Sequence, residues 1–469
     1  MTLTKQYIQL LFANRQISIP EKRMPLFEAF ITEEENGSLV QQILHNQQLL
    51  MSKWKLQSRV LEVQEQSLTI PNGTVGKAYE AFIDRAQLQW EDVGIVDVPG
   101  LEDLGLNFDA ASGCISGTPG LSGDFRISIL FRLQEEPEDA PAHEKKLTLI
   151  INPDPRSLWK NKDSDREDPY WKEDNVAVFA ALGDKHILAA SRRGRSHANT
   201  GAFREDDFAC KHFAANGWSI AAVSDGAGSA KLSRMGSRIA CNAVVSFFDK
   251  HWQPDTLEPL DSLLREHQQN NNAETARQLN HFVYTHLGQA ALHAHQQLET
   301  FAQENACELR DLHATLIFVL FKKYDFGYAI CSFGVGDCPI GLMSADQSSI
   351  SLMNKLDVGE FGGGTRFVTM QEIFRQDSFA SRFGFRLVPD FSYLVLMTDG
   401  IYDPKFVVEA NLEKPERWQE FFADLQGSNE TGAAVQLDAG NTHITEQLSA
   451  WMDFWSPGNH DDRTLLIIF

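Results

Sequence analysis

The chain has 469 residues and a formal net charge of -22 at pH 7, with 43% hydrophobic and 23% charged residues. This is the composition of an ordinary globular protein of about two to four domains, and it excludes a disordered or fibrous chain. The negative charge argues against nucleic acid and anionic membrane surfaces as partners, because both would carry the same sign as the protein.

The sequence also bears on the cellular compartment. No run of about 18 apolar residues is present, and the apolar run at the N-terminus is too short for a signal peptide. The six cysteines contain no CxxC pair and stand mostly in apolar runs, as reduced structural thiols do. We therefore expect a cytoplasmic protein that does not bind membranes.

The pattern of apolar and polar residues changes twice in the first part of the chain. Residues 1–62 place apolar side chains such as Leu39 and Ile43 at helical spacing, which predicts a helical N-terminal region. Residues 63–152 consist of short strand-like runs between turn residues, which is typical of a small β-sandwich. Residues 153–173 mix proline and charge with little periodicity, which predicts a linker.

One motif in the predicted β-sandwich resembles the immunoglobulin-like or cadherin-like repeat. The run LGLNFDAASGCISGTPG carries the resemblance through Asp109, Gly113, Ile115, Gly117 and Pro119. The resemblance implies a small all-β module that binds a partner or acts as a spacer, so we assign no chemistry to it.

Residues 174–469 form the largest predicted domain. Strand-like runs come first, then two amphipathic helices, and then strands again. Strands in runs with helices between them indicate an α+β sandwich of sheets rather than an alternating β-α-β fold.

Acidic residues stand at strand ends or beside glycine in this domain. IAAVSDG and YLVLMTDG are apolar runs that close with an Asp-Gly pair. Taken singly, each pair is better explained by an ordinary turn. Together, carboxylates aimed at one place would repel by about 4 kcal/mol per pair at 4 Å and an effective dielectric constant of 20. Oxygen ligands without Cys or His suit Mg²⁺ or Mn²⁺. The acids are Glu205, Asp206, Asp225, Asp337, Asp399, Asp403, Asp461 and Asp462.

The motifs of residues 174–469 resemble those of the metal-dependent protein phosphatases of the 2C type, in their bacterial form. They follow the family's order: RGRSHANTGAFREDDF, VSDGAGSA, HATLIFVLF, FGVGDCPIGL, LMTDGIYD and DDRTLLII. The resemblance implies a four-layer αββα sandwich. It also implies hydrolysis of phosphoserine or phosphothreonine in proteins by metal-activated water. This activity would reverse the phosphorylation carried out by a partner Ser/Thr kinase.

The resemblance further implies a centre of two Mn²⁺ or Mg²⁺ ions, with a possible third. Asp225 would bridge the two ions and the Gly226 carbonyl would bind one of them. Glu205 would join the second ion, and Asp399 and Asp461 would complete the first.

Further roles follow from the same resemblance. Asp206 would orient the attacking water, and Asp337 and Asp403 would hold the third ion together with Asp399. The segment GEFGGGT (359–365) lacks the lysine of a phosphate-binding loop, so we interpret it as a turn in the family's variable flap.

Two positions depart from the family pattern. Ala227 stands where many members have a histidine that can protonate the leaving group, so His197 is our candidate donor, unless its imidazole only caps a loop. Gly201 stands where eukaryotic members have a phosphate-binding arginine. Arg195 is our candidate for that contact, although it and its neighbours Arg193 and Arg204 could equally be surface charges.

These departures keep a second hypothesis open, a pseudophosphatase that only binds phosphoprotein. The retained acids argue against it, because they have no structural reason to cluster without metal. A carboxylate-based nuclease is disfavoured by the negative charge.

Overall fold

The computed structural model describes residues 2–270, 272–357, 364–375 and 377–469. The glycine-rich turn expected at 359–365 therefore lies largely outside the described residues.

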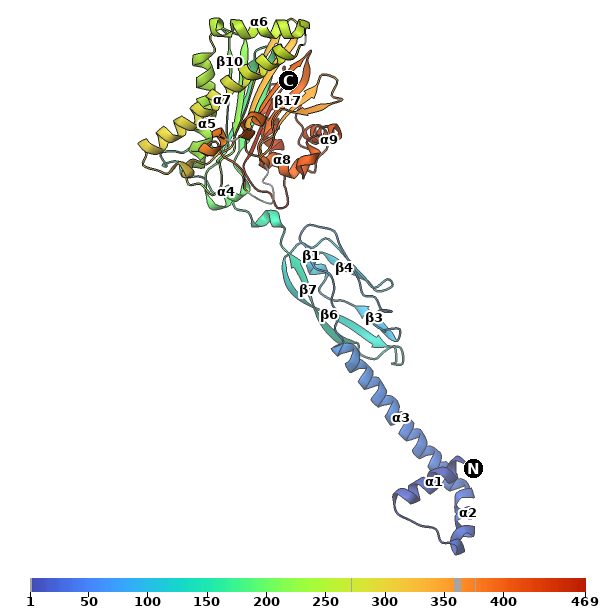
Figure 1. Cartoon of the computed structure of the whole chain (residues 1–469). Coiled ribbons are helices and arrows are strands. Elements are labelled where there is room, and N and C mark those ends of the chain that lie inside the picture. The colour runs from blue at the N-terminus through green and yellow to red at the C-terminus, as the bar shows by residue number, and fades with distance from the viewer. Residues whose placement is uncertain (1, 271, 358–363, 376) are drawn as a thin grey trace. The chain divides into compact units, whose positions relative to one another are not determined.

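The contacts divide the chain into two compact units, Met1–Leu158 and Trp159–Phe469 (Figure 1). Among the described helices, none is long and apolar enough to cross a membrane. All six cysteines are free thiols, four of them buried.

The first unit begins with helices, which confirms the predicted helical N-terminus. The hydroxyl of Thr2 caps the first helix by accepting a hydrogen bond from the backbone N–H of Lys5, and a proline occupies the first turn of the second. Ile8, Phe27 and Ile31 pack with a residue of the third helix in a small core of their own. The helices are α1 (Leu3–Asn14), α2 (Met24–Thr32) and α3 (Glu34–Glu65).

The rest of the first unit is all-β and contains two sheets. Burial alternates along β6 and β7, so one side of that sheet faces a core that contains Trp90 and Phe131. One sheet has the order β1 (Gly73–Thr74), β7 (His143–Asn152), β6 (Gly123–Leu133), β3 (Val93–Asp97), and the other β2 (Tyr79–Phe82), β5 (Cys114–Gly117), β4 (Leu106–Asp109).

The second unit contains two antiparallel sheets packed face to face. The five-stranded sheet has the order β10 (Asp207–Phe213), β11 (Trp218–Ser224), β12 (Leu316–Tyr324), β13 (Gly327–Val335), β16 (Phe383–Val388). The six-stranded sheet has the order β15 (Ile350–Leu352), β14 (Ile340–Ser344), β17 (Phe391–Met397), β18 (Arg463–Ile468), β9 (Lys185–Arg192), β8 (Asn175–Leu182).

Helices cover the outer face of each sheet, so the second unit has four layers. One core lies between the sheets, and one lies on each side beneath the helices. The predicted mixed α+β fold is confirmed. The five-stranded sheet carries α5 (Ser233–His251), α6 (Pro254–Asn270) and α7 (Ala273–Glu304), and the six-stranded sheet carries α8 (Asp399–Phe406), α9 (Pro415–Leu425) and α10 (Ile444–Trp451).

Residues 159–173 belong to the second unit, although their composition is that of a linker. Ser164 and Lys172 in this segment are buried. The Ser164 hydroxyl donates to Asp174 Oδ1 at 2.7 Å, and Lys172 Nζ donates to the backbone carbonyl of Asp206 at 2.7 Å. The segment is therefore tied to the strands that carry the acidic residues.

Candidate active site

Asp225 follows a strand that is buried along its whole length. All seven residues of β11 are buried, because helices cover one face of its sheet and the second sheet covers the other. The backbone N–H of Asp225 donates to Thr315 Oγ1 at 2.9 Å, and the N–H of Thr315 donates to the Asp225 carbonyl at 2.8 Å. The start of β12 thus fixes the place where this carboxylate leaves the sheet.

The glycine after each strand-end aspartate lets a second acidic segment come close. A Cβ at Gly226 would lie 2.8 Å from the carbonyl oxygen of Glu205, and a Cβ at Gly400 would lie 1.8 Å from that of Asp462. Real Cβ atoms essentially never approach other atoms so closely. The two Asp-Gly pairs therefore bring acids from distant parts of the chain together.

Asp206 is the most enclosed acid of the first motif, with 1% of its surface exposed. The hydroxyls of Thr398 and Thr464 donate to its Oδ2 at 2.8 and 2.7 Å. Thr398 follows β17 and Thr464 lies in the neighbouring strand β18, so the six-stranded sheet holds this carboxylate in place.

The acids predicted as ligands or catalytic groups converge, and we call them the acidic cluster: Glu205, Asp206, Asp225, Asp337, Asp399, Asp403 and Asp461. Burial raises the pKa of Asp225 and of Asp399 well above the usual value, and neighbouring carboxylates of the cluster raise both further. Burial also raises the pKa of Glu205 and that of Asp206 to about 7. Desolvation and neighbouring carboxylates also raise the pKa of Asp337, Asp403 and Asp461, although Asp403 and Asp461 lie at the solvent-exposed edge of the cluster.

Two carboxylate oxygens of the acidic cluster fit a cation. Asp399 Oδ1 and Glu205 Oε2 are buried without a hydrogen-bond partner among the described residues. A buried acceptor left unpaired costs about 1–3 kcal/mol, and more when it is charged. Divalent cations would satisfy these oxygens and offset the repulsion within the cluster, and carboxylate oxygens are the ligands that Mg²⁺ and Mn²⁺ take.

The acids expected at a third ion belong to the same cluster. Asp399 and Asp403 are four residues apart in α8 and so lie on one face of that helix. Asp337 Oδ2 accepts a hydrogen bond from Thr365 Oγ1 at 2.7 Å, and the charge of Asp337 raises the pKa of Asp403 in addition to its burial.

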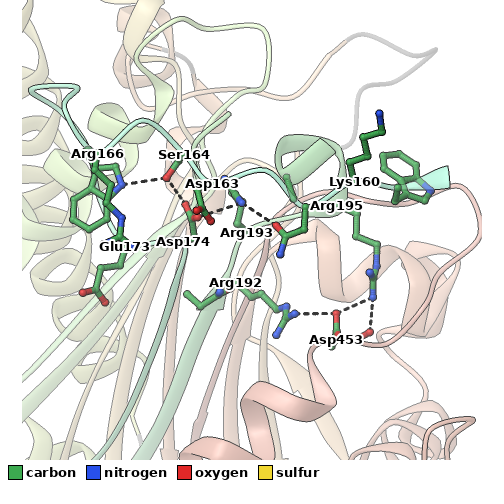
Figure 2. Close-up of a pocket in the computed structure, with 15 residues that line it drawn as sticks. Lys160, Asp163, Ser164, Arg166, Glu173, Asp174, Arg192, Arg193, Arg195 and Asp453 are labelled. Atoms are coloured by element: carbon green, nitrogen blue, oxygen red, sulfur yellow. Dashed lines mark hydrogen bonds and ion pairs between the residues drawn. The ribbon is translucent and has the colours of Figure 1, made fainter. Parts of the chain in front are cut away.

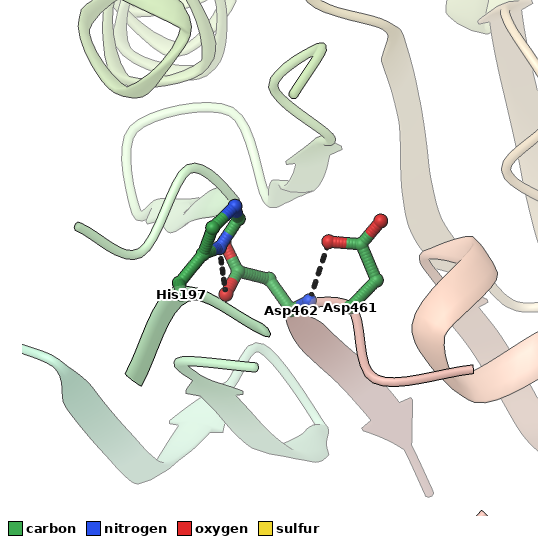
Figure 3. Close-up of side chains that lie close together, drawn as sticks. All are labelled: His197, Asp461 and Asp462. Atoms are coloured by element: carbon green, nitrogen blue, oxygen red, sulfur yellow. Dashed lines mark hydrogen bonds and ion pairs between the residues drawn. The ribbon is translucent and has the colours of Figure 1, made fainter. Parts of the chain in front are cut away.

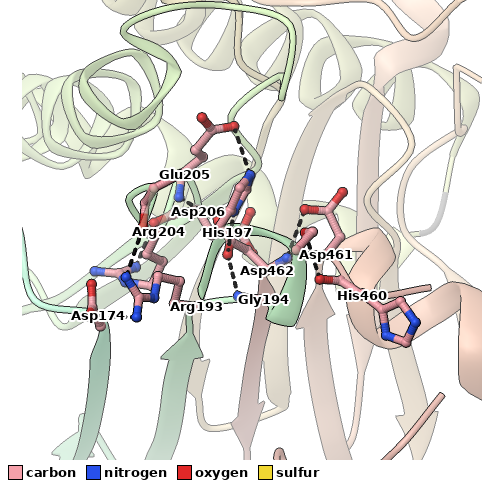
Figure 4. Close-up of polar contacts among 12 residues, drawn as sticks. Asp174, Arg193, Gly194, His197, Arg204, Glu205, Asp206, His460, Asp461 and Asp462 are labelled. Atoms are coloured by element: carbon pink, nitrogen blue, oxygen red, sulfur yellow. Dashed lines mark hydrogen bonds and ion pairs between the residues drawn. The ribbon is translucent and has the colours of Figure 1, made fainter. Parts of the chain in front are cut away.

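His197 lies beside the acidic cluster, in the short helix α4 (Arg195–Thr200) that follows β9. Its Nδ1 bonds to Asp462 Oδ1 at 2.9 Å, and its Nε2 lies 3.8 Å from Glu205 Oε2 (Figures 3 and 4). Burial opposes protonation, yet the hydrogen bond and charge of Asp462 raise the pKa of His197 to about 9.

Ligand atoms of His197, Asp461 and Asp462 lie within 4.8 Å of one another. A histidine that is protonated at neutral pH is not a metal ligand, because ligation needs the neutral ring. Asp462 is occupied as well, since it also accepts from the backbone N–H groups of Gly194 and Glu205. We therefore interpret His197 and Asp462 as a buried ion pair, and Asp461 as the member available to a cation.

The arginines of the first motif do not bind the carboxylates of the acidic cluster. Arg195 Nη2 donates to Asp453 Oδ1 and to the Asp453 carbonyl, each at 2.8 Å. Arg193 pairs with Asp174 at 3.2 Å, and Arg204 donates to the carbonyl of Glu173 at 3.0 Å. Among the described residues, none of the three arginines contacts a carboxylate of the acidic cluster.

Arg195 instead lines a polar cavity of about 490 Å³, next to α4 (Figure 2). Arg192 reaches the same Asp453 at 2.9 Å, so two guanidinium groups share one carboxylate there. Trp159 and Trp171 of the segment 159–173 also line the cavity. The phosphate contact expected for Arg195 remains a prediction, and it requires the guanidinium to turn from this cavity.

Several residues that position the site were not anticipated. Three threonines stand within two residues of a motif acid or at the start of a strand beside one: Thr315, Thr398 and Thr464. A hydroxyl at such a position is the only feature of the sequence that could have predicted their role. Lys172 carries no such signal, because it lies in a segment with linker composition. Asp462, a neighbour of a predicted ligand, holds the backbone of the first motif instead.

The profile of the protein phosphatase 2C family matches residues 193–452, which is more than half of the chain. The chain belongs to the protein phosphatase 2C family. The matched segment includes most of the acidic cluster, whereas Lys172 precedes it and Asp461 follows it. No curated protein sequence matches this phosphatase 2C chain.

Solved structures of other proteins are similar to this chain at low identity. Stp1 from Staphylococcus aureus is 14% identical over 64% of this chain and 98% of its own, with a TM-score of 0.35. The catalytic domain of PstP, in complex with two manganese ions, is 14% identical over 63% and 98%, with a TM-score of 0.36. RsbX with magnesium is 12% identical over 62% and 98%, with a TM-score of 0.33. The family assignment rests on the sequence profile alone.

Proposed function

We propose that the chain is a metal-dependent protein phosphatase that hydrolyses phosphoserine or phosphothreonine in proteins and opposes a partner Ser/Thr kinase. Membership of the 2C family supports the phosphatase activity. The observation that carries the metal dependence is the acidic cluster. Burial and neighbouring carboxylates raise the pKa of Asp225 and of Asp399, and Asp399 Oδ1 is buried without a hydrogen-bond partner among the described residues. Only cations make such a cluster stable in its charged form.

The proposed ligands are the predicted ones. Two Mn²⁺ or Mg²⁺ ions would be held by Asp225, Glu205, Asp399, Asp461 and the Gly226 carbonyl. Asp337 and Asp403 would hold a third, weaker ion together with Asp399.

When bound, the cations activate a water molecule as Lewis acids and neutralise the phosphate oxygens. Asp206, held by Thr398 and Thr464, orients the attacking water. His197 donates a proton from Nε2 to the leaving oxygen while Nδ1 stays bonded to Asp462. Arg195 would donate to the substrate phosphate once its guanidinium turns away from Asp453, to which it is bonded in this structure.

The first unit serves recruitment in this proposal. Residues 1–62 form a helical region and residues 63–152 an immunoglobulin-like module. They precede the phosphatase domain, which includes residues 159–173 as well as 174–469. Two small sheets around one core support an all-β module, as the sequence motif implied. The phosphoprotein substrate or the kinase would bind there.

Hydrolysis of a phosphothreonine peptide tests the proposal, with wild type and Asp225→Asn compared in the presence and absence of Mn²⁺. We expect Asp225→Asn to lose at least about 10³ in rate, or about 4 kcal/mol of transition-state stabilisation. Asp346→Asn is the matched control, since Asp346 is an exposed turn residue whose carboxylate accepts from Ser344 and Ser348. A wild type that binds Mn²⁺ and phosphopeptide without turnover would identify a phosphoprotein-binding pseudophosphatase instead.

A further inference from the structure

Most of the large hydrophobic side chains that are exposed among the described residues lie in the first 61 residues. On α3 five of the seven form one line along the helix, whereas Leu49 and Met51 lie to either side of it. At 100° per residue, its members fall within about 60° of arc over a length of about 33 Å. Their exposed fractions run from 40% at Ile43 to 69% at Leu50. We call this line the α3 stripe: Leu39, Ile43, Leu50, Trp54 and Leu61.

The rest of the first unit packs on other faces of α3. The core of the N-terminal helices uses Val40 and Leu44. The core of the β-sheets uses Leu56, Val60 and Val63. The chain thus covers other faces of α3 near both ends and leaves the α3 stripe exposed along its length. A contiguous apolar surface of this kind marks an interaction site in a globular protein.

The spacing of the α3 stripe is the same in both directions. Leu39, Ile43, Leu50 and Trp54 are separated by 4, 7 and 4 positions. With a twofold axis beside position 46–47, an antiparallel second helix places Leu39 opposite Trp54 of the second copy and Ile43 opposite Leu50 of the second copy. Each of these four side chains then meets an apolar partner.

Polar residues on the same face are also paired by this twofold axis. Asn46 would meet Gln47 of the second copy at the axis. Position 36 would lie opposite position 57 further out, although the Asn36 amide already donates to the Phe30 carbonyl and to Glu33 Oε2. Amide side chains can hydrogen-bond to one another, whereas a shifted register would place them against leucine. A polar residue inside an apolar seam specifies register in this way, at some expense of stability.

Charge also favours the antiparallel direction. Glu35 in the first turn of α3 and Lys53 in its second half lie on the same flank, each about 70° from the middle of the α3 stripe at 100° per residue. In the antiparallel arrangement Lys53 lies opposite position 40 of the second copy, about one and a half helical turns from Glu35 of the second copy, whereas Lys55 and Glu34 point away from the seam. A parallel arrangement would place glutamate beside glutamate and lysine beside lysine. Like charges opposed across an interface weaken it and steer the choice of partner.

We propose that α3 is a dimerisation helix that binds a second copy of this chain in antiparallel orientation through the α3 stripe. The proposal depends on the first unit alone and stands or falls independently of the phosphatase chemistry. Dimerisation would join two catalytic chains whose β-sheets follow α3 at opposite ends of the seam.

The mass of the full chain in solution tests the proposal, measured by sedimentation equilibrium. We expect wild type to be dimeric and Leu50→Glu to be monomeric, because two carboxylates would be buried in the seam. Gln48→Glu is the matched control, since position 48 is exposed on the opposite side of α3. A monomeric wild type, or a Leu50→Glu variant that stays dimeric, would overturn the proposal, and helix content by circular dichroism confirms that each variant is folded.

Cysteine cross-linking tests the orientation without removing an apolar residue. We expect Asn36→Cys and Gln57→Cys chains to form a disulfide when mixed, and neither to cross-link alone. A parallel seam would give the reverse pattern and contradict the antiparallel proposal. Wild type is the control, because Cys210 and Cys307 are partly exposed thiols and set the background.

Discussion

Gly400 lies against the backbone carbonyl of Asp462, so closely that a Cβ on the glycine would be 1.8 Å from that oxygen. The two proposed ligands Asp399 and Asp461 immediately precede these residues. The contact therefore joins the start of α8 to the segment before β18, and it fixes how far apart the two ligands stand.

Replacing Gly400 with alanine should lower the affinity for Mn²⁺. The methyl group must push the Asp462 segment away, and overpacking of this kind costs about 1–3 kcal/mol of folding stability. We expect weaker Mn²⁺ binding by calorimetry and an earlier midpoint in urea. Gly120→Ala is the control, because a Cβ at Gly120 would meet nothing within 4 Å. Equal Mn²⁺ affinity in Gly400→Ala and wild type would mean that this contact does not set the ligand separation.

Particular residues show how much of the site could be predicted from the sequence. The apolar run before Asp225 predicts a buried strand and hence a carboxylate delivered at its end, and the structure has both. Nothing local could predict that the hydroxyls of Thr398 and Thr464 would meet on Asp206, because that bond depends on the pairing of β17 with β18. Periodicity describes one element at a time, whereas the site is made by contacts between elements.

The segment before the family match gives a second example. Its proline and charge predicted a linker, and local composition contains no sign that one of its lysines would be buried. Lys172 Nζ donates to the carbonyls of Asp206 at 2.7 Å and Arg234 at 3.2 Å, and to Asp207 Oδ2 at 3.0 Å. Only the tertiary fold supplies these acceptors.

A chain that begins at Trp159 should therefore fold and bind Mn²⁺, and one that begins at Asp174 should not. The longer chain keeps Lys172 and its hydrogen bonds to the backbone next to Glu205 and Asp206. The shorter chain lacks this donor, and each buried acceptor left without a partner costs about 1–3 kcal/mol of folding stability. Thermal melts and Mn²⁺ titrations distinguish the two chains.

Point variants separate the lysine from the rest of that segment. In the longer chain, Lys172→Met should lower Tm and Mn²⁺ affinity, whereas Lys160→Met, at an exposed position, should change neither. Normal Mn²⁺ binding in the chain that begins at Asp174 would show that the segment is dispensable for the site.

Removal of metal should make stability depend steeply on pH. Burial raises the pKa of Glu205 and of Asp206 to about 7, above their values in the unfolded chain. The folded protein then binds more protons than the unfolded chain between about pH 4.5 and 7, so stability is highest at the acidic end and falls as pH rises. His197 acts in the same direction at higher pH, because its pKa of about 9 also exceeds the unfolded value.

We expect the Tm of EDTA-treated protein to fall as the pH is raised from about 5.5 to 8, and Mg²⁺ to restore more of it at the higher pH. Asp399→Asn removes one repelling charge, so its Tm in EDTA should depend less on pH and respond less to Mg²⁺. A metal-free Tm that rises across this range would contradict the assignment of raised pKa values to the acidic cluster.

Replacing His197 with glutamine should slow the enzyme according to the leaving group. A threonine alkoxide needs a proton as it departs, whereas p-nitrophenolate leaves without one. If His197 is the donor, His197→Gln should lose about 10²-fold in kcat on a phosphothreonine peptide, the low end of general acid catalysis, and little on p-nitrophenyl phosphate. The glutamine amide can keep the hydrogen bond to Asp462, so the first motif should stay in place.

The ratio of the two substrates separates this role from a structural one. If His197 only holds Asp462, its loss would displace Glu205 as well, since the Glu205 N–H donates to the same carboxylate. Both substrates would then slow together and Mn²⁺ affinity would fall. A selective loss on the peptide, with unchanged Mn²⁺ affinity, would assign the proton to His197 and explain how the family's chemistry proceeds with Ala227 in place of the usual histidine. His443→Gln, at an exposed position before α10, should leave both rates unchanged.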